Sequence, residues 1–277
     1  MDKTINYCLL PLSKGELEGV CLPVSTRDGS NGSSRKGRQT PPNLPLERGG
    51  SEKYCMKILS ECNLSEIVFE ILNGKTLVFP TETSYGLGCD ATNQSAVDKI
   101  FKIKGRKSDK PLLVVVPTVE MAKKFLVWND TLDELSKKYW PGALTIVGEV
   151  LPLSNSLLCE GERDATLASA EERAGRGLAR GVIANDNTVA IRVTSLPLLV
   201  SITEKIGRPL VATSANISDA GEIYDAEKIY QTFESRPDQP DFILNYGTLP
   251  VHPPTTIIRV NHDKIEVLRQ GEVAVEL

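Results

Sequence analysis

Six basic residues fall between Lys99 and Lys110, where a single acidic residue accompanies them. Lys104 and Arg106 flank Gly105, so the chain can turn at the glycine and bring both cations to one loop. An arginine offers a planar fork and a lysine a mobile point charge, a combination that suits the phosphates of a partly buried nucleotide. A solvated basic helix end, favoured by the helix dipole, is the commoner origin of such a run, so both interpretations stay open here.

A second polar group, Thr213 to Asn216 (TSAN), follows an apolar run that favours a strand. Its hydroxyls and amide can bind phosphate oxygens or a ribose through neutral hydrogen bonds. Read without context, Ser214-x-Asn216 is more often an ordinary turn. The chain has no GxxxxGK[ST] sequence and no GxGxxG after a strand. A nucleotide would therefore bind outside the two commonest phosphate loops.

A third candidate is the stretch Thr76–Asp90, TLVFPTETSYGLGCD, in which an apolar strand leads into hydroxyls, a carboxylate and two glycines. A strand that ends in a polar, glycine-containing loop is a usual place for a ligand in α/β proteins. An ordinary polar turn explains the stretch equally well. Cys89 at its end is predicted to be a small buried filler and not a nucleophile.

The composition is that of an ordinary globular protein, with 277 residues, 40% hydrophobic and 25% charged. The net charge of −4 means that nucleic acid could bind only at a local basic patch. Six scattered cysteines without a CxxC pair predict reduced thiols in the cytoplasm. His252 and His262 lie in turn-like contexts without ligand spacing, which predicts neither a protein metal site nor a histidine-activated nucleophile. No apolar run is long enough to predict a membrane span.

The chain divides into a segment of residues 1–55 and a domain of residues 56–277. Residues 25–50 are rich in Ser, Gly, Pro and Arg, and such a sequence buries too little surface to offset its chain entropy. We predict a disordered or low-complexity tail, favoured over a basic arm on RNA because aromatic residues are absent from it. Residues 151–187 interrupt the pattern of the domain and are predicted to be a surface insertion.

The domain alternates helical and strand patterns before a strand-rich end, which predicts an α/β fold with a mixed sheet. Helices are predicted at 63–74, at 93–104, from a cap at Thr131 to Pro141, and at 197–207 and 226–233. Strands are predicted at 76–79, 112–116, 143–150, 188–193, 210–213, 242–244, 256–260 and 265–268.

Seven sequence blocks occur in a specific order between about Ile58 and Val273. They are PTETSYGLGCD, KGR, KPLLVVV, YWPGALTIV, TVAIRV, PLVATSANISDAGE and TTIIRV…VLRQGEV. In this order they resemble the YrdC family of threonylcarbamoyl-AMP synthases. The resemblance implies a YrdC/RibB-like twisted mixed sheet with flanking helices and a concave basic groove. Because the chain ends at Leu277, we expect the single-domain type of the family.

The resemblance also implies a reaction. A nucleotidyltransferase would join L-threonine, bicarbonate and ATP, with Mg²⁺ bound to the ATP, into L-threonylcarbamoyladenylate and release pyrophosphate. A tRNA threonylcarbamoyl transferase complex would then pass the product to adenosine 37 of tRNA, giving t6A. Such chemistry needs positioning and charge neutralisation but no protein nucleophile, which agrees with a chain that has no catalytic triad.

Matched position by position, the resemblance implies a catalytic tetrad at the nucleotide: Lys104, Arg106, Ser214 and Asn216. Further ATP contacts are implied at Lys110, Thr188 and Arg269. Threonine would be held by Thr83, Arg192, Ala212 and Thr255, with Arg192 pairing with its carboxylate.

The chain departs from the family pattern at three places. Lys107 follows the KxR motif where proline is frequent, and Val115 stands where the longer branch has a histidine. Asp219 and Ala220 lengthen the SAN loop.

A tRNA or double-stranded RNA-binding module that uses the same basic groove is the alternative function, and a direct contact with tRNA is left open. A carbamoyl-transfer role like that of hydrogenase-maturation proteins lacks its accompanying segments. The net charge and the threonine-type residues favour the synthase.

Overall fold

The computed structural model describes residues 56–59, 63–107, 110–151, 177–218 and 220–276. All of them lie within one unit, Tyr54–Leu277. The predictions for residues 1–55 and for residues 152–176 of the expected insertion fall outside the described residues. Among the described helices, none has the length and apolarity needed to cross a membrane.

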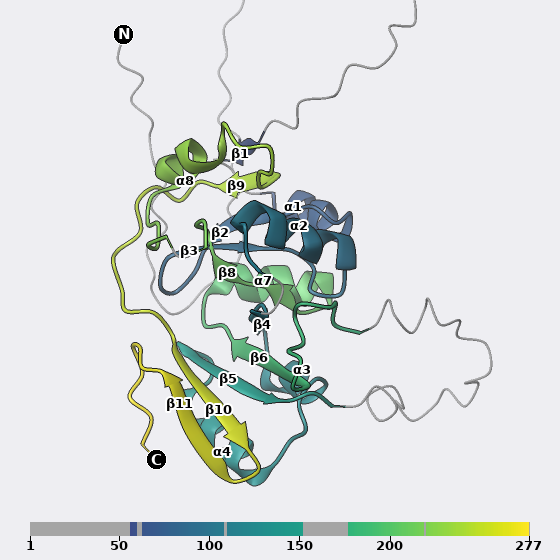
Figure 1. Ribbon diagram of the computed structural model, residues 1–277, viewed down its shortest axis with the longest axis vertical. Helices are drawn as coiled ribbons and strands as arrows, with labels where there is room; N and C mark the ends of the chain where they lie inside the picture. The colour runs from purple at the N-terminus through teal and green to yellow at the C-terminus, as the bar shows by residue number, and fades with distance from the viewer. Residues whose placement is uncertain (1–55, 60–62, 108–109, 152–176, 219, 277) are drawn as a thin grey trace, which may run out of the picture. The chain divides into compact units, whose positions relative to one another are not determined.

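The described strands form two mixed sheets (Figure 1). In the first, the order is β1 (Lys57–Leu59), β9 (Phe242–Leu244), β2 (Leu77–Pro80), β3 (Tyr85–Gly88) and β8 (Thr213–Ser214). The pairs among β1, β9 and β2 are parallel, and β3 runs antiparallel to both β2 and β8. The predicted α/β class is confirmed, with two sheets in place of one.

The second sheet has the order β11 (Lys264–Arg269), β10 (Thr256–Asn261), β5 (Leu144–Glu149), β6 (Thr188–Val193), β4 (Val114–Val116) and β7 (Leu210–Val211). β10 and β5 are parallel, as are β6 and β4, and the other pairs are antiparallel. Figure 1 shows β10 and β11 as a long pair at the end of this sheet that lies away from β1 and β9.

The described helices are α1 (Leu64–Leu72), α2 (Gln94–Lys104), α3 (Val119–Lys123), α4 (Asp130–Tyr139), α7 (Pro197–Ile206) and α8 (Ala226–Phe233). Side chains of Asn63 and Asn93 accept from backbone N–H groups of the first turn, which confirms two predicted caps. The cap predicted at Thr131 is wrong, because Asn129 accepts from Leu132 N and the helix begins before Thr131. Helix α3 was not predicted, because five residues are too few to show a period.

Strand β2 is covered on both faces, which explains its unbroken apolar sequence. Leu77 and Phe79 pack in one core with α1 and α7, whereas Val78 packs in the other with α2 and α8. Since side chains alternate along a strand, the two helix pairs must lie on opposite faces of the first sheet. The sheet is thereby fixed between two layers of helices, and the loops at its strand ends are held in place.

The structure differs from two of the strand predictions, and both differences bring candidate site residues together. The stretch predicted as one loop after Pro80 contains a strand of its own, β3, so that only residues 81–84 are loop. The single strand predicted at 210–213 is divided between the two sheets as β7 and β8, with Ala212 at the crossing. As a result Ser214 pairs with Gly86, and Ala215 N donates to Tyr85 O at 2.9 Å. The SAN loop therefore adjoins the loop that precedes β3.

Residues 177–187, the described end of the expected insertion, are anchored in the core. Ala179 and Val182 are buried. Leu112 N donates to Gly181 O at 2.8 Å, which ties this segment to the chain leading into β4.

Gly88 is required by the close approach of the protein's own backbone. A Cβ at this position would lie 1.9 Å from Val211 O and 2.8 Å from the ring of Phe79. We expect Gly88→Ala to lower the free energy of unfolding by at least about 3 kcal/mol, measured by urea denaturation. The control is Gly207→Ala, where φ is +64° and no atom lies within 4 Å of a Cβ, with an expected cost of about 1–2 kcal/mol. Equal costs for the two variants would contradict the steric explanation.

Candidate functional site

Lys104 is the centre of the first cluster, although it lies at the end of a basic helix. Its side chain is 1% exposed. Nζ donates to Ser214 O at 2.5 Å, to Asn216 O at 2.9 Å and to Asn216 Oδ1 at 2.9 Å. The solvated helix end that the sequence left open is therefore wrong for Lys104, which joins α2 to the SAN loop.

The local sequence explains how Lys104 is turned inward. Gly105 ends α2 in the left-handed conformation, with φ of 57°, so the chain leaves the helix axis directly after Lys104. Burial, with the charge of Arg106 as a second cause, lowers the pKa of Lys104 to about 7. A lysine poised near neutrality can bind an anion and gain its proton as it does so.

The SAN loop is held in shape by Asn216. Ser214 Oγ donates to Asn216 Oδ1 at 2.7 Å, and Asn216 Nδ2 donates to Ala220 O and Gly221 O. Asn216 thus closes a turn that reaches Ala220, one of the two residues by which the loop departs from the family pattern. Three members of the implied tetrad, Lys104, Ser214 and Asn216, form one hydrogen-bonded unit.

Arg192 and Glu82 form a second, buried cluster. Arg192 is 2% exposed, and its Nη2 lies 3.2 Å from Glu82 Oε2. Glu82 Oε1 accepts from Thr194 Oγ1 at 2.5 Å and from Ser195 N at 2.9 Å. Burial raises the pKa of Glu82, but the charge of Arg192 and these hydrogen bonds together outweigh it and hold the pKa below its ordinary value.

Two atoms of this ion pair have no hydrogen-bond partner. Glu82 Oε2 and Arg192 Nε are both inaccessible to solvent and unsatisfied. An unsatisfied buried polar group costs about 1–3 kcal/mol, so the protein folds with a donor and an acceptor that stay unused.

The other implied threonine residues lie near Arg192. Arg192 is in register with Val115, and Val115 with Leu210, so these side chains share a sheet face. Ala212, at the crossing between the two sheets, packs in the same core as Val115 and Leu210. Thr83 lies next to Glu82 and its Oγ1 is 3.3 Å from Thr81 Oγ1.

Thr255, the residue before β10, reaches the same region. Thr145 Oγ1 donates to Thr255 Oγ1 at 3.4 Å. Thr145 precedes Ile146, which pairs with Ile191, so antiparallel register sets Thr145 opposite Arg192. Arg269 donates through Nε and Nη2 to Thr255 O at 3.0 and 2.9 Å. Burial lowers the pKa of Arg269, and the charge of Glu222 partly offsets this effect. The charge of Arg192 also lowers it, so the two arginines are close enough to interact electrostatically.

The remaining implied ATP contacts are less closely joined. Arg106 donates through Nε to Lys110 O at 2.9 Å and through Nη2 to Pro111 O at 3.0 Å, so it folds back on its own loop. Thr188 opens β6 and its hydroxyl donates to Asp186 Oδ1 at 2.6 Å. Thr188 shares a face with Arg192 but lies roughly 13 Å from it along the strand.

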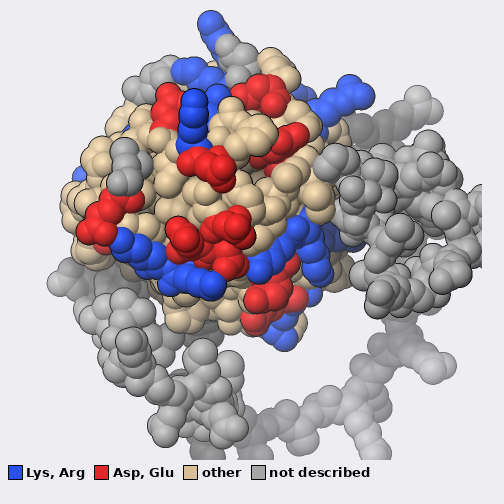
Figure 2. All heavy atoms as spheres, turned by 90° about the horizontal axis from the view of Figure 1, so that it is seen from below, with Lys and Arg blue, Asp and Glu red and all other residues tan. Residues whose placement is uncertain are grey.

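The concave basic groove stays a prediction. Among the hollows lined by described residues, one of about 10 Å³ lies beside α1 and one of about 670 Å³ lies beside α8 and residues 222–225. Neither is lined by an implied site residue. On the face shown in Figure 2, acidic and basic side chains alternate without one sign prevailing. The described residues include no group of three or more His, Cys, Asp or Glu that could hold a metal ion.

Glu82 is the partner of Arg192 that sequence reasoning missed. The loop was recognised for its hydroxyls, and the carboxylate was left without a role. One signal was present in the sequence: an arginine expected to hold a carboxylate from within a strand needs a counter-charge when it is buried, and Glu82 lies in the adjoining candidate loop.

Comparisons with known proteins agree with this arrangement. The family model of the Sua5, YciO and YrdC proteins, described as "Telomere recombination", matches residues 70–271. The threonylcarbamoyl-AMP synthase of Pyrococcus abyssi is 30% identical over 74% of this chain and 53% of its own length. That of Vibrio vulnificus is 29% identical over 63% of this chain and 82% of its own length.

A solved structure shows the same fold. The P. abyssi Sua5 structure complexed with L-threonine has a TM-score of 0.62 and 25% identity, covering 78% of this chain and 57% of that one. The chain thus spans about half the length of the P. abyssi relative. From the match over residues 70–271, the chain belongs to the Sua5/YciO/YrdC family.

Proposed function

We propose that this chain is a threonylcarbamoyl-AMP synthase. L-Threonine, bicarbonate and ATP would give L-threonylcarbamoyladenylate and pyrophosphate. The observation that carries the proposal is the burial of two cations, Lys104 and Arg192, on either side of the adjoining PTET and SAN loops. Neutral oxygens hold Lys104, and Arg192 keeps an unused donor beside its carboxylate partner, so both can take further negative charge from the phosphates and the carboxylate of the two substrates.

Each residue has a role that its chemistry supports. Lys104 and Arg106 would neutralise charge on the phosphates as pyrophosphate leaves. Ser214 and Asn216 would hold the nucleotide by neutral hydrogen bonds, aided by Lys110, Thr188 and Arg269. Arg192 would pair with the threonine carboxylate, while Thr83, Ala212 and Thr255 shape the pocket around it. Holding the carbamylated threonine in line with the α-phosphate supplies the main rate advantage.

Mg²⁺ would arrive with ATP, with its ligands supplied by phosphate oxygens and water. The product would pass to a tRNA threonylcarbamoyl transferase complex for t6A formation at position 37. A cytoplasmic location stays a prediction from the sequence. The named relatives favour the synthase over the RNA-binding alternative.

The direct test measures pyrophosphate release from Mg²⁺ and ATP with and without L-threonine and bicarbonate. Release should require both substrates, and L-serine should replace threonine poorly. Pyrophosphate release that does not depend on threonine would remove the synthase function.

We expect Arg106→Ala to lower turnover by about a hundredfold, because one cation at the phosphates is lost. Arg106 donates to the carbonyl groups of Lys110 and Pro111 in its own loop, and the thermal midpoint is measured beside turnover so that a loss of folded protein is not mistaken for a loss of catalysis. Arg236→Ala, at an exposed position after α8, is the control and should keep full turnover. If both variants turn over at the wild-type rate, Arg106 does not belong to the site.

A further inference from the structure

Glu82 differs from an ordinary structural carboxylate. Its Oε1 is satisfied by Thr194 Oγ1 and Ser195 N. Its Oε2 faces Arg192 Nη2 at 3.2 Å but accepts no hydrogen bond, and Arg192 Nε beside it donates none. The pair therefore holds one unused acceptor and one unused donor in the same buried place.

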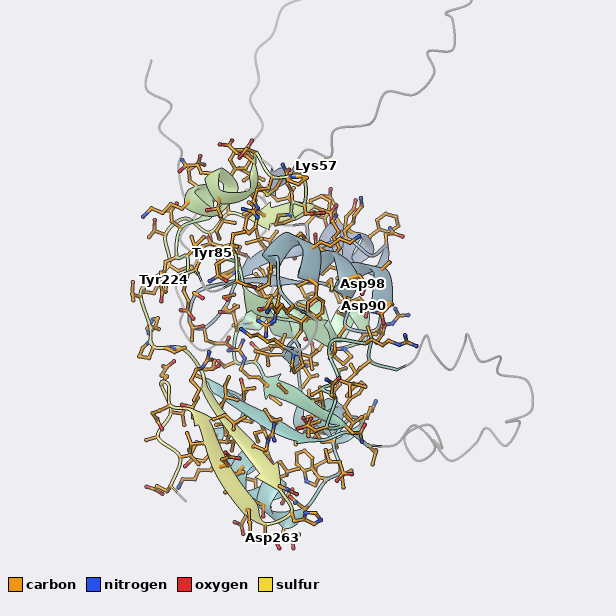
Figure 3. The ribbon with its side chains drawn as sticks, in the orientation of Figure 1. Lys57, Tyr85, Asp90, Asp98, Tyr224 and Asp263 are labelled. Carbon is orange, nitrogen blue, oxygen red and sulfur yellow. The ribbon has the colours of Figure 1, made fainter. Side chains whose placement is uncertain are left out.

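Asp90 provides the comparison within the same chain (Figure 3). Its Oδ1 accepts from Thr92 N at 2.8 Å and Thr92 Oγ1 at 2.7 Å, and its Oδ2 accepts from Arg208 Nη1 at 2.7 Å. The donors are of the same kinds as at Glu82: an arginine, a threonine hydroxyl and a backbone N–H. Both oxygens of Asp90 are satisfied, so Asp90 acts as a structural carboxylate, and the unused oxygen of Glu82 calls for another explanation.

An α-amino acid supplies the missing partners. Its carboxylate and its ammonium group are attached to one carbon, so a site for it needs a cation and an anion side by side. Arg192 and Glu82 are such a pair, and the other neighbours assigned to threonine lie around them. In the absence of the amino acid, each side chain serves as an incomplete partner for the other.

We propose, on the basis of the synthase function above, that Glu82 is the residue that recognises the α-amino group of threonine. Arg192 pairs with the carboxylate, and Glu82 Oε2 accepts an N–H of the amino group. Because both atoms are buried in the ligand-free structure, the Glu82 side chain must move off Arg192 as threonine enters. The bound zwitterion then replaces one ion pair by two.

The test compares L-threonine with (R)-3-hydroxybutyrate, which keeps the carboxylate and hydroxyl but lacks the amino group. The KM for threonine and the inhibition constant of the analogue are measured for wild type, Glu82→Gln and the control Asp90→Asn. Glu82→Gln should raise the KM for threonine about tenfold to a hundredfold, the range of a charge-assisted hydrogen bond. The inhibition constant of the analogue and the KM for ATP should change less than about threefold. Asp90→Asn should lower the thermal midpoint but leave all three constants unchanged.

Other outcomes overturn the proposal. An unchanged KM for threonine in Glu82→Gln removes Glu82 from substrate binding. An equal loss of affinity for threonine and for the analogue means that Glu82 only positions Arg192. If the analogue inhibits neither enzyme more than an equal concentration of sodium chloride does, threonine binding is measured by calorimetry instead. In that case, the proposal is overturned if Glu82→Gln binds threonine with the same enthalpy and affinity as wild type.

Two further safeguards keep the test decisive. If Glu82→Gln fails to fold, Glu82→Asp keeps the countercharge for Arg192 but withdraws the carboxylate, and should raise the KM for threonine while sparing the KM for ATP. An equal KM for threonine in Glu82→Asp and wild type overturns the proposal. If wild-type pyrophosphate release needs no threonine, the synthase function itself is lost, which is distinct from the failure of Glu82 alone.

Discussion

Replacing Lys104 by methionine is expected to lower turnover by about a hundredfold to a thousandfold, the effect of losing one preorganised donor at the transferring phosphate. Methionine keeps the length of the side chain and its packing but removes the charge and the three hydrogen bonds to Ser214 and Asn216. Pyrophosphate release at saturating ATP measures the effect. Lys102→Met, two residues earlier on the same helix at an exposed position, is the control and should retain wild-type turnover.

The same residue predicts a pH dependence of ATP binding. With a pKa of about 7 in the ligand-free protein, Lys104 is mostly charged at pH 6 and mostly neutral at pH 8. Only the charged form attracts phosphate, so the dissociation constant of ATP should rise about tenfold between these two pH values. In Lys104→Met, the dissociation constant of ATP should change with pH only through the protonation of ATP itself. The difference between the wild-type and Lys104→Met profiles therefore reports the titration of Lys104. Parallel profiles for wild type and Lys104→Met would contradict the assignment.

Stability should respond to pH in the direction that a lowered lysine pKa requires. The pKa of Lys104 has its ordinary value of 10.5 in the unfolded chain and is lowered by burial to about 7 in the folded chain. Between these values the unfolded state binds more protons, so the contribution of Lys104 to folding stability rises with pH from about 7 to about 10.5. ATP binding opposes this trend, because the phosphates return the proton to Lys104.

Local chemistry was enough to predict most of the helices. Asn93 caps α2 and Gly105 ends it in the left-handed conformation, and both signals are short-range features of the sequence. The central strands β4 and β5 of the second sheet were equally visible, because their apolar runs are almost fully buried. What the sequence could not predict was the division of residues 210–214 between two sheets, since that depends on which strands lie beside them.

In the candidate site too, short-range sequence features were predictable, whereas contacts between residues distant in the sequence were not. The motifs predicted which residues belong together, and the structure joins Lys104 with Ser214 and Asn216. The burial of Lys104 depends on acceptors more than a hundred positions away in the chain, so a helix-end pattern could not reveal it. Glu82 was overlooked for the same reason, because its partners Arg192, Thr194 and Ser195 lie on the far side of β4 and β5 in the sequence.

Arg192→Met should strongly lower threonine-dependent pyrophosphate release and also destabilise the fold. The substitution leaves Glu82 buried without its counter-charge, which costs about 3–5 kcal/mol when a buried ion pair loses one partner. The KM for threonine should rise at least a hundredfold, because the carboxylate loses its charged partner. Urea denaturation and threonine-dependent turnover measure the two effects separately.

The double variant Arg192→Met/Glu82→Gln separates substrate recognition from folding. Removing both charges avoids a buried carboxylate without a partner, so most of the lost stability should return while threonine stays unrecognised.

The pH dependence of folding stability has a definite sign in each of these variants. In wild type the lowered pKa of Glu82 gives a contribution to stability that is lost as pH falls through it. In Arg192→Met, burial is opposed only by the hydrogen bonds to Glu82, so the pKa of Glu82 should be higher than in wild type. This single variant should therefore lose less stability than wild type as pH falls, and the double variant should lack the contribution of this carboxyl group. Recovery of threonine turnover in the double variant would show that Arg192 and Glu82 serve the fold alone, and persistent loss in a protein of restored stability would place the pair at the substrate.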